Sequence, residues 1–141
     1  MFHHLLLHIF YQLYYNLKNF KHVNKIVPYR SGDLVMRQYA QFAKSILIED
    51  ELLARLGGDN YIALVKKERV ETVIEELQNI RVNVETTAGQ QVELPIQIRA
   101  GVYMIPDSAQ HQGDIMLPVA LAYQAVRQMG SVNVLYYTPE I

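Results

Sequence analysis

The residues best suited to chemistry are Gly57-Gly58-Asp59-Asn60, which separate two short apolar runs. The flanking runs, residues 53–56 and 61–65, carry strand-favouring side chains, so the pattern predicts a β-hairpin with the four residues at its tip. Two glycines there permit positive φ angles and close approach to the backbone. The tip is the first candidate for a site, and the plain alternative is that the glycines only make a tight turn.

A second candidate is Asp33, which follows Pro28 and precedes apolar residues that recur at helical spacing. That spacing predicts an amphipathic helix that ends near residue 47. Taken alone, Asp33 is a first-turn carboxylate that satisfies free N–H groups at the positive end of the helix. The residues by themselves leave this structural role as the simplest one.

The apolar N-terminal segment, residues 5–15, is shorter than the roughly twenty residues that span a bilayer. His8 and Gln12 interrupt it, and it lacks the basic flank and cleavage site of a signal peptide. We therefore expect no direct insertion into a membrane. Its aromatic end, residues 10–15, predicts a buried central strand, with a core helix as the main alternative for the segment.

The remaining pattern predicts elements that complete a layered fold. Helices are expected over residues 68–82 and 114–129, a long strand over residues 92–105 and a final strand over residues 132–137. The order strand, helix, hairpin, helix, strand, helix, strand predicts the α/β (α+β) class. Helices would pack on a mixed, mainly antiparallel sheet in one domain spanning residues 1–141.

Composition narrows the class of protein. The chain has 141 residues, of which 50% are hydrophobic and 19% charged, with a formal net charge of -1. These values are typical of a globular domain, and the lack of a basic excess argues against nucleic acid as a partner. The chain has no cysteine, which excludes disulfides and thiolate metal sites and fits a reducing, cytoplasmic setting.

Three fragments in register carry a resemblance to a known family. They are Phe20-Lys21-His22-Val23-Asn24, Gly32-Asp33-Leu34-Val35 and the hairpin, residues 54–64. Together they resemble the GGDEF family, the bacterial diguanylate cyclase domains that condense two GTP into cyclic di-GMP. Residues 98–102 and 120–127 extend the resemblance along the chain. It implies a palm-like fold shared with nucleotidyl cyclases, with the hairpin beside the first strand.

The resemblance also implies a site for GTP or another guanine nucleotide. Asn24 and Asp33 would pair with the edge of the guanine base. Gly57 and Gly58 would let backbone N–H groups approach the phosphates. Arg127 is the residue of the predicted last helix that could contact the terminal phosphate after a local shift.

The metal and catalytic positions depart from the family pattern. Asp59 would be one carboxylate ligand of Mg²⁺. The family's Asp-x-Asp falls on Asn16-Leu17-Lys18, which replaces two negative charges by one positive charge on the same face of a strand. Asn60 replaces an acid central to the family's reaction, and an amide cannot act as a carboxylate base. We expect a weak site at Asp59, with Asn16 as its partner position, and Mg²⁺ only when nucleotide is bound.

The family's inhibitory product site, an Arg-x-x-Asp, falls on Ile48-Glu49-Asp50-Glu51. Because the arginine is missing, binding of cyclic di-GMP there is not expected.

These residues favour a degenerate GGDEF domain, a non-catalytic regulatory or interaction module with residual guanine-nucleotide binding. The alternative is an active diguanylate cyclase that uses one metal held by Asp59 and backbone carbonyls. An unrelated α/β domain and a structural dimerisation module remain further alternatives. The expected partners are a fused sensory or phosphodiesterase-like domain and a second copy of the chain, so we expect the sequence to be one domain of a larger protein.

Overall fold

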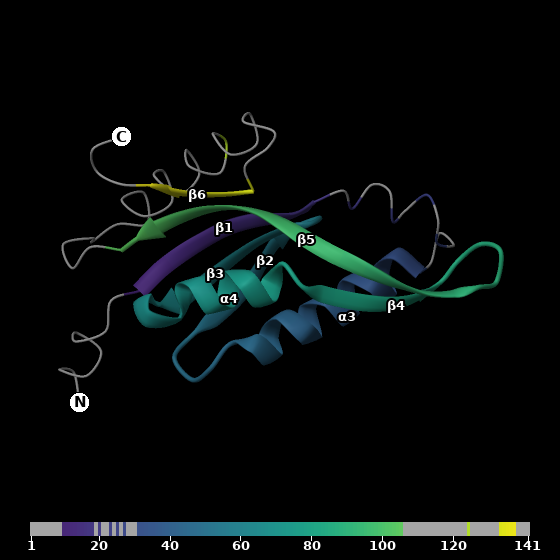
Figure 1. Ribbon diagram of the computed structural model, residues 1–141, viewed down its shortest axis with the longest axis horizontal. Coiled ribbons are helices and arrows are strands. Elements are labelled where there is room, and N and C mark those ends of the chain that lie inside the picture. The colour runs from purple at the N-terminus through teal and green to yellow at the C-terminus, as the bar shows by residue number, and fades with distance from the viewer. Residues whose placement is uncertain are drawn as a thin grey trace.

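The computed structural model describes residues 10–18, 20, 23, 25, 27, 31–105, 124 and 133–137. The strands are β1 (Phe10–Lys18), β2 (Leu52–Gly57), β3 (Asn60–Lys66), β4 (Ile80–Glu85), β5 (Gln91–Met104) and β6 (Val134–Tyr137). The helices are α3 (Ser31–Ile46), the short 3₁₀ helix η1 (Lys67–Arg69) and α4 (Val70–Leu77). Helices α3 and α4 lie on the same side of the sheet (Figure 1).

The sheet is mixed and mainly antiparallel, as the sequence predicts. Its strand order is β2-β3-β1-β5-β4, and each neighbouring pair in that order is antiparallel. Strand β6 pairs with β5 in parallel. The predicted α/β (α+β) fold class is therefore correct.

Strand β1 lies at the centre of the sheet and fixes the position of the candidate site. Leu13, Tyr15 and Leu17 are buried on the face that packs against the helices. Successive side chains of a strand point to opposite faces, so Asn16 and Lys18 project from the other face. The predicted central strand over residues 10–15 is confirmed and extends to Lys18, which rules out the core helix for those residues.

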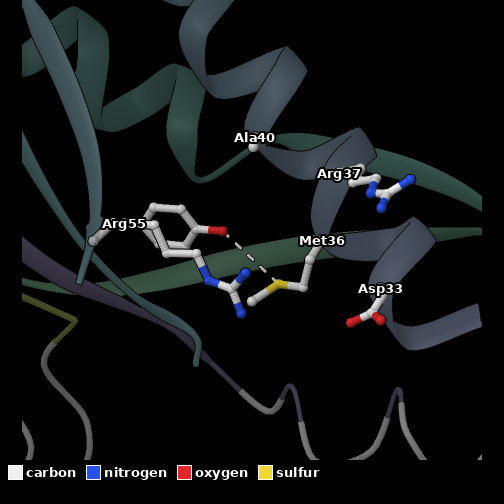
Figure 2. A pocket seen from close by; sticks show the side chains of 6 residues that line it. Asp33, Met36, Arg37, Ala40 and Arg55 are labelled. Carbon is white, nitrogen blue, oxygen red and sulfur yellow. Dashed lines mark hydrogen bonds between the residues drawn. The ribbon is translucent and has the colours of Figure 1, made fainter. Parts of the chain in front are cut away.

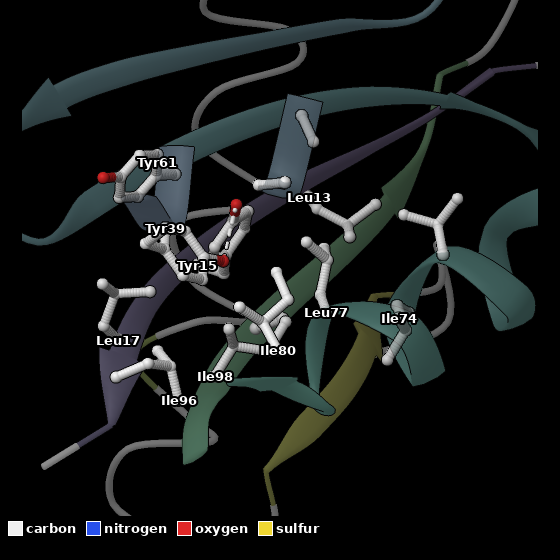
Figure 3. Packing of buried hydrophobic residues seen from close by; sticks show 14 of the residues in the cluster. Leu13, Tyr15, Leu17, Tyr39, Tyr61, Ile74, Leu77, Ile80, Ile96 and Ile98 are labelled. Carbon is white, nitrogen blue, oxygen red and sulfur yellow. Dashed lines mark hydrogen bonds between the residues drawn. The ribbon is translucent and has the colours of Figure 1, made fainter. Parts of the chain in front are cut away.

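An aromatic cluster joins α3 to the middle of the sheet (Figure 3). Tyr15 of β1 stacks on Tyr61 of β3 with 5.4 Å between the ring centroids. The hydroxyl of Tyr39, on α3, donates a hydrogen bond of 3.1 Å to the hydroxyl of Tyr15. All three rings are at most 1% exposed, so the hydrogen bond supplies the polar partner that a buried phenol needs.

The helix predicted over residues 68–82 is wrong in its second half. Helix α4 ends at Leu77, and residues 80–85 form β4 with strictly alternating buried and exposed side chains. Strand β4 pairs with β5, in a register that places Ile80 opposite Ile96. Pairing with β5 therefore overrides a helical spacing that happens to continue through Ile80.

Most of the other predicted elements lie within the described residues and are confirmed. The helix expected up to residue 47 is confirmed as α3, and the long strand over residues 92–105 is confirmed as β5. The final strand is confirmed over Val134–Tyr137. The helix predicted over residues 114–129 lies outside the described residues. Within the described part of the chain, no helix is long and apolar enough to cross a membrane.

Candidate functional site

The predicted hairpin is present, and its tip has the backbone conformation that glycine permits. Gly57 has a φ of 150° and Gly58 a φ of 54°, both in the region that other residues rarely adopt. A Cβ atom at either position would meet no atom within 4 Å. Conformation, and not crowding within the fold, thus accounts for glycine at the tip.

Two hydrogen bonds fix the tip in place. The Nε of Arg55 donates a bond of 2.7 Å to the carbonyl oxygen of Gly58, within the hairpin itself. The backbone N–H of Leu17 donates a bond of 3.1 Å to the carbonyl oxygen of Asp59. The second bond joins the tip to the end of β1, so the hairpin lies beside the first strand as the resemblance implies.

The candidate metal position lies where β1 meets the tip. The side-chain amide of Asn16 donates a hydrogen bond of 3.1 Å to the Asp59 carboxylate. Asn16 is also paired in register with Asn60, so these two amides share one face of the sheet. The structure thus brings together the residues at which the sequence departs from the family.

These side chains do not fit a Mg²⁺ site held by the protein. Mg²⁺ usually takes one or two carboxylates together with substrate phosphates. Asp59 provides one carboxylate, and Asn16 already donates to it. No group of three or more His, Cys, Asp or Glu residues that could hold a metal ion occurs in the described part of the chain. The donor set is that of a polar junction, not of a divalent-cation site.

Lys18 lies two positions after Asn16 on β1, on the same face of the strand. Its Nζ donates a hydrogen bond of 3.2 Å to the side-chain oxygen of Asn133. The backbone oxygen of Asn133 in turn accepts a bond of 2.8 Å from the N–H of Ala100, on β5. The family pattern assigns Lys18 to the metal position from the sequence alone. Its partner Asn133 was not predicted, because the two residues are 115 positions apart in the chain.

Asp33 lines a pocket of about 240 Å³ between α3 and the hairpin (Figure 2). The pocket is also lined by Met36, Arg37, Ala40, Arg55 and Tyr61. Ligand pockets typically measure about 300–1,000 Å³, so this one suits part of a ligand, such as a base.

The floor and the rim of this pocket differ in character. The hydroxyl of Tyr61 donates a hydrogen bond of 3.8 Å to the sulfur of Met36, which closes the floor. Burial raises the pKa of Tyr61, so the phenol stays neutral. The rim carries the Asp33 carboxylate and the guanidinium of Arg55 (Figure 2). Since Arg55 also bonds to Gly58, it connects the pocket to the hairpin tip.

Of the predicted site residues, six are described: Asn16, Asp33, Gly57, Gly58, Asp59 and Asn60. Asn16 and the tip residues come together at the end of β1. Asp33 lines a separate pocket, which Arg55 links to the tip through its bond to Gly58. Asn24 and Arg127 lie outside the described residues, and their assignments stay predictions.

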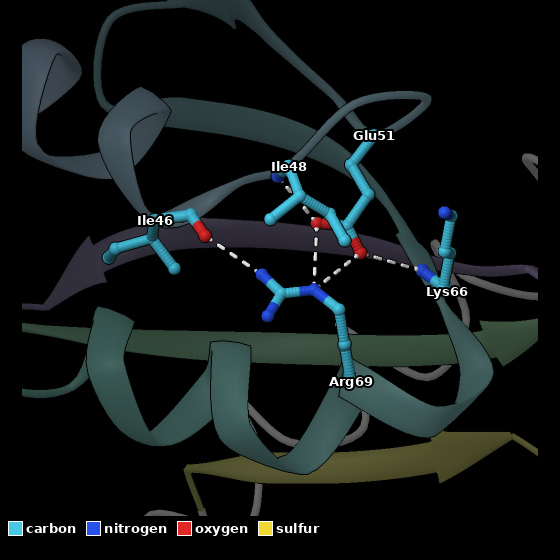
Figure 4. A network of polar contacts seen from close by, with 5 residues as sticks. All are labelled: Ile46, Ile48, Glu51, Lys66 and Arg69. Atoms are coloured by element: carbon cyan, nitrogen blue, oxygen red, sulfur yellow. Dashed lines mark hydrogen bonds and ion pairs between the residues drawn. The ribbon is translucent and has the colours of Figure 1, made fainter.

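Glu51 is a structural residue in this fold (Figure 4). Its carboxylate forms an ion pair of 3.1 Å with Arg69 and accepts hydrogen bonds from the backbone N–H groups of Ile48 and Lys66. Arg69 also donates to the carbonyl oxygen of Ile46. Because the Glu51 side chain is fully buried, it has no surface to offer a ligand.

Comparison with known proteins decides the family. The model of the family described as diguanylate cyclase, GGDEF domain, matches residues 6–132. The chain belongs to the GGDEF family. It is 25% identical over 135 residues to the probable diguanylate cyclase DgcE of Escherichia coli (strain K12). The matched segment covers 91% of this chain and 12% of DgcE. The first relatives after DgcE are uncharacterized membrane proteins of Staphylococcus, and the chain spans 28% to 35% of their lengths.

Solved structures show the same fold. The GGDEF domain of DgcB from Caulobacter crescentus, solved in complex with c-di-GMP, has a TM-score of 0.73 and 18% identity, over 92% of this chain and 78% of that one. An EAL/GGDEF domain protein from M. capsulatus has a TM-score of 0.69 and 19% identity, over 93% and 86% of the two chains.

Proposed function

We propose that this GGDEF domain is a non-catalytic module of cyclic di-GMP signalling that retains guanine-nucleotide binding. The observation that carries the proposal is the junction of Asn16, Asp59 and Asn60. There the Asn16 amide donates to the Asp59 carboxylate and Asn60 lies opposite Asn16 in register, at the position that the resemblance assigns to the family's metal. Formation of a phosphodiester bond needs a base and stabilisation of developing negative charge. This junction has one carboxylate, Asp59, which accepts from Asn16, and an amide, Asn60, in place of the family's acid.

Nucleotide binding is supported by a separate part of the structure. The pocket presents the Asp33 carboxylate, an acceptor suited to the N–H donors of guanine, on its rim. Gly57 and Gly58 leave the hairpin backbone open to a phosphate chain. Asn24 and Arg127 would complete the contacts to base and terminal phosphate, and any Mg²⁺ would reach Asp59 only with the nucleotide.

The proposal places the domain in the cytoplasm, beside a fused sensory or phosphodiesterase-like domain that it regulates, and with a second copy as a further partner. The similar structure from M. capsulatus is that of an EAL/GGDEF domain protein, which supports a fused arrangement.

Calorimetry with GTP, GDP and cyclic di-GMP tests the binding half of the proposal. We expect GTP and GDP to bind and cyclic di-GMP to give no heat, since Ile48 stands in place of the arginine of the product site. Asp33→Ala should weaken GTP binding about tenfold, through loss of a charged acceptor. The matched control is Glu75→Ala, which removes an exposed carboxylate on α4 and should leave the affinity unchanged.

The proposal is wrong if GTP gives no heat at millimolar concentration. Asn24 would then be a turn or cap residue and Asp33 a helix-start carboxylate. If Asp33→Ala leaves the affinity for GTP unchanged, Asp33 does not contact the base.

A further inference from the structure

The face of the sheet opposite α3 and α4 carries two cations beside the candidate metal position. In register with Asn16 on β1, Arg99 lies directly across on β5. Residues directly opposite in a strand pair share a face, and Lys18 follows Asn16 on that face two positions along. Arg99 was not identified from the sequence, because the register that places it beside Asn16 is not visible there.

The charge of this cluster is inverted relative to the family pattern. Lys18 and Arg99 contribute two positive charges, and the Asp59 carboxylate contributes one negative charge. An Asp-x-Asp on β1 would need a divalent cation before a polyphosphate could approach. Here the protein itself supplies the positive charge, and Asn16 donates to the one carboxylate that would repel a phosphate.

Arg99 has a donor without an acceptor. Its Nε is buried and has no hydrogen-bond partner in the described part of the protein. Buried donors are normally satisfied, because an unpaired one loses its hydration without compensation. A guanidinium presents its N–H groups in a planar fork that matches phosphate oxygens. A phosphate bound at the guanidinium would supply an acceptor for the Nε once the side chain moves enough to expose it.

Lys18 is held in place and is not a loosely placed surface lysine. It is partly buried, and its Nζ bonds to Asn133, which is itself fixed by the N–H of Ala100 beside Arg99. An ammonium has three donors, so a bond to Asn133 orients Lys18 and leaves it able to bind a further acceptor.

We propose that Lys18 and Arg99 form an anion site that holds the phosphates of the bound nucleotide without a divalent cation. The proposal deepens, and rests on, the nucleotide binding proposed above. In this chain a lysine at the second position of the Asp-x-Asp, together with Arg99, takes over the electrostatic role of the metal.

Calorimetry with two probes, GTP and inorganic tripolyphosphate, tests the proposal in EDTA and in millimolar Mg²⁺. We expect both probes to bind in EDTA, with GTP affinity within about twofold of its value in Mg²⁺. Lys18→Gln and Arg99→Gln should each weaken both probes about tenfold, since each removes a charge-assisted contact. Lys67→Gln and Arg81→Gln, which change exposed cations elsewhere, are the matched controls.

A charge reversal gives an independent readout. The double variant Asn16→Asp with Lys18→Asp should lose GTP binding in EDTA and regain it in Mg²⁺, because carboxylates restore the need for a cation. Thermal melts of each variant in the absence of ligand establish that the fold is retained.

The outcomes separate the two proposals. The anion site is wrong if GTP binds only in Mg²⁺, or if binding in EDTA is unchanged by Lys18→Gln and Arg99→Gln. Neither result contradicts nucleotide binding itself. Binding of tripolyphosphate without GTP, dependent on both cations, supports the anion site and overturns the guanine-nucleotide proposal. If neither probe binds, both proposals are wrong.

Discussion

Tyr15 and Tyr39 make the stability of this fold depend on pH. Both phenols are buried in the core, and burial raises the pKa of each well above the ordinary value of 10.0. The folded protein therefore keeps both protons at a pH where the unfolded chain begins to lose them. Their contribution to stability is complete below about pH 10 and decreases as the pH rises above it.

Tyr39→Phe tests this linkage. The substitution removes the hydrogen bond to Tyr15 and should lower the free energy of unfolding by about 1 kcal/mol near neutral pH. It also removes one group that ionises on unfolding, so stability should decrease less steeply above about pH 10 than in the wild type. Urea unfolding at neutral and alkaline pH measures both effects.

Tyr136→Phe is the control for the alkaline effect. Tyr136 is 38% exposed, so removal of its hydroxyl should change the slope less. A Tyr39→Phe protein with the wild-type slope would contradict the role given to burial.

The sequence pointed to some residues of the candidate site and not to others, for physical reasons. Asn16, Asp59 and Asn60 could be located because the hairpin and the end of β1 have local motifs. These motifs remain recognisable although some of their residues are substituted. Arg99 and Asn133 carry no local signal, since their positions beside β1 depend on strand register and on long-range hydrogen bonds. Register is set by the whole sheet and not by neighbouring residues.

At the scale of elements, side-chain amides satisfy strand backbone on the side where no strand pairs with it. The amide of Gln78 bonds to both the N–H and the carbonyl oxygen of Ile98, at 2.8 and 3.0 Å. The amide of Gln38, on α3, does the same for Asn83 on β4, at 3.2 and 2.9 Å. These bonds connect helices to strands, and the second covers backbone at an edge of the sheet.

The boundary between α4 and β4 shows where sequence patterns fail. Helical spacing correctly predicted the buried face of α4, including Val73 and Leu77. The alternation from Ile80 to Glu85 is an equally regular strand pattern, but Ile80 satisfies both periods. Only the pairing with β5 decides between them, and pairing is a property of the assembled sheet.

The ion pair Glu51–Arg69 connects the loop after α3 to η1, and Glu51 also accepts from the backbone N–H of Lys66 at the end of β3. Glu51→Ala should lower the free energy of unfolding by about 3 kcal/mol, because it leaves Arg69 and two backbone N–H groups without their acceptor. Glu93→Ala is the matched control, since its ion pair with Arg81 is exposed and should change stability by less than about 1 kcal/mol.

Denaturant unfolding of the two variants gives the comparison. Equal losses of stability would show that Glu51 does not have the structural role assigned here.

At the scale of the whole molecule, the fold of a diguanylate cyclase is retained while the charges at the end of β1 are changed. The sheet and the hairpin beside β1 give the family's fold. At the end of β1, Asn16 donates to Asp59, and Lys18 lies two positions further along the strand. We therefore propose that nucleotide binding is separated from catalysis in this domain.

The most direct test of this separation is an assay for cyclic di-GMP after purified protein is incubated with GTP and Mg²⁺ or Mn²⁺. Protein concentrations high enough for two copies to meet are needed, because the reaction joins two GTP molecules. We predict no product above that formed by Asp59→Ala, under conditions in which calorimetry detects GTP binding. Turnover to cyclic di-GMP that Asp59→Ala abolishes would contradict the account and identify the chain as an active cyclase.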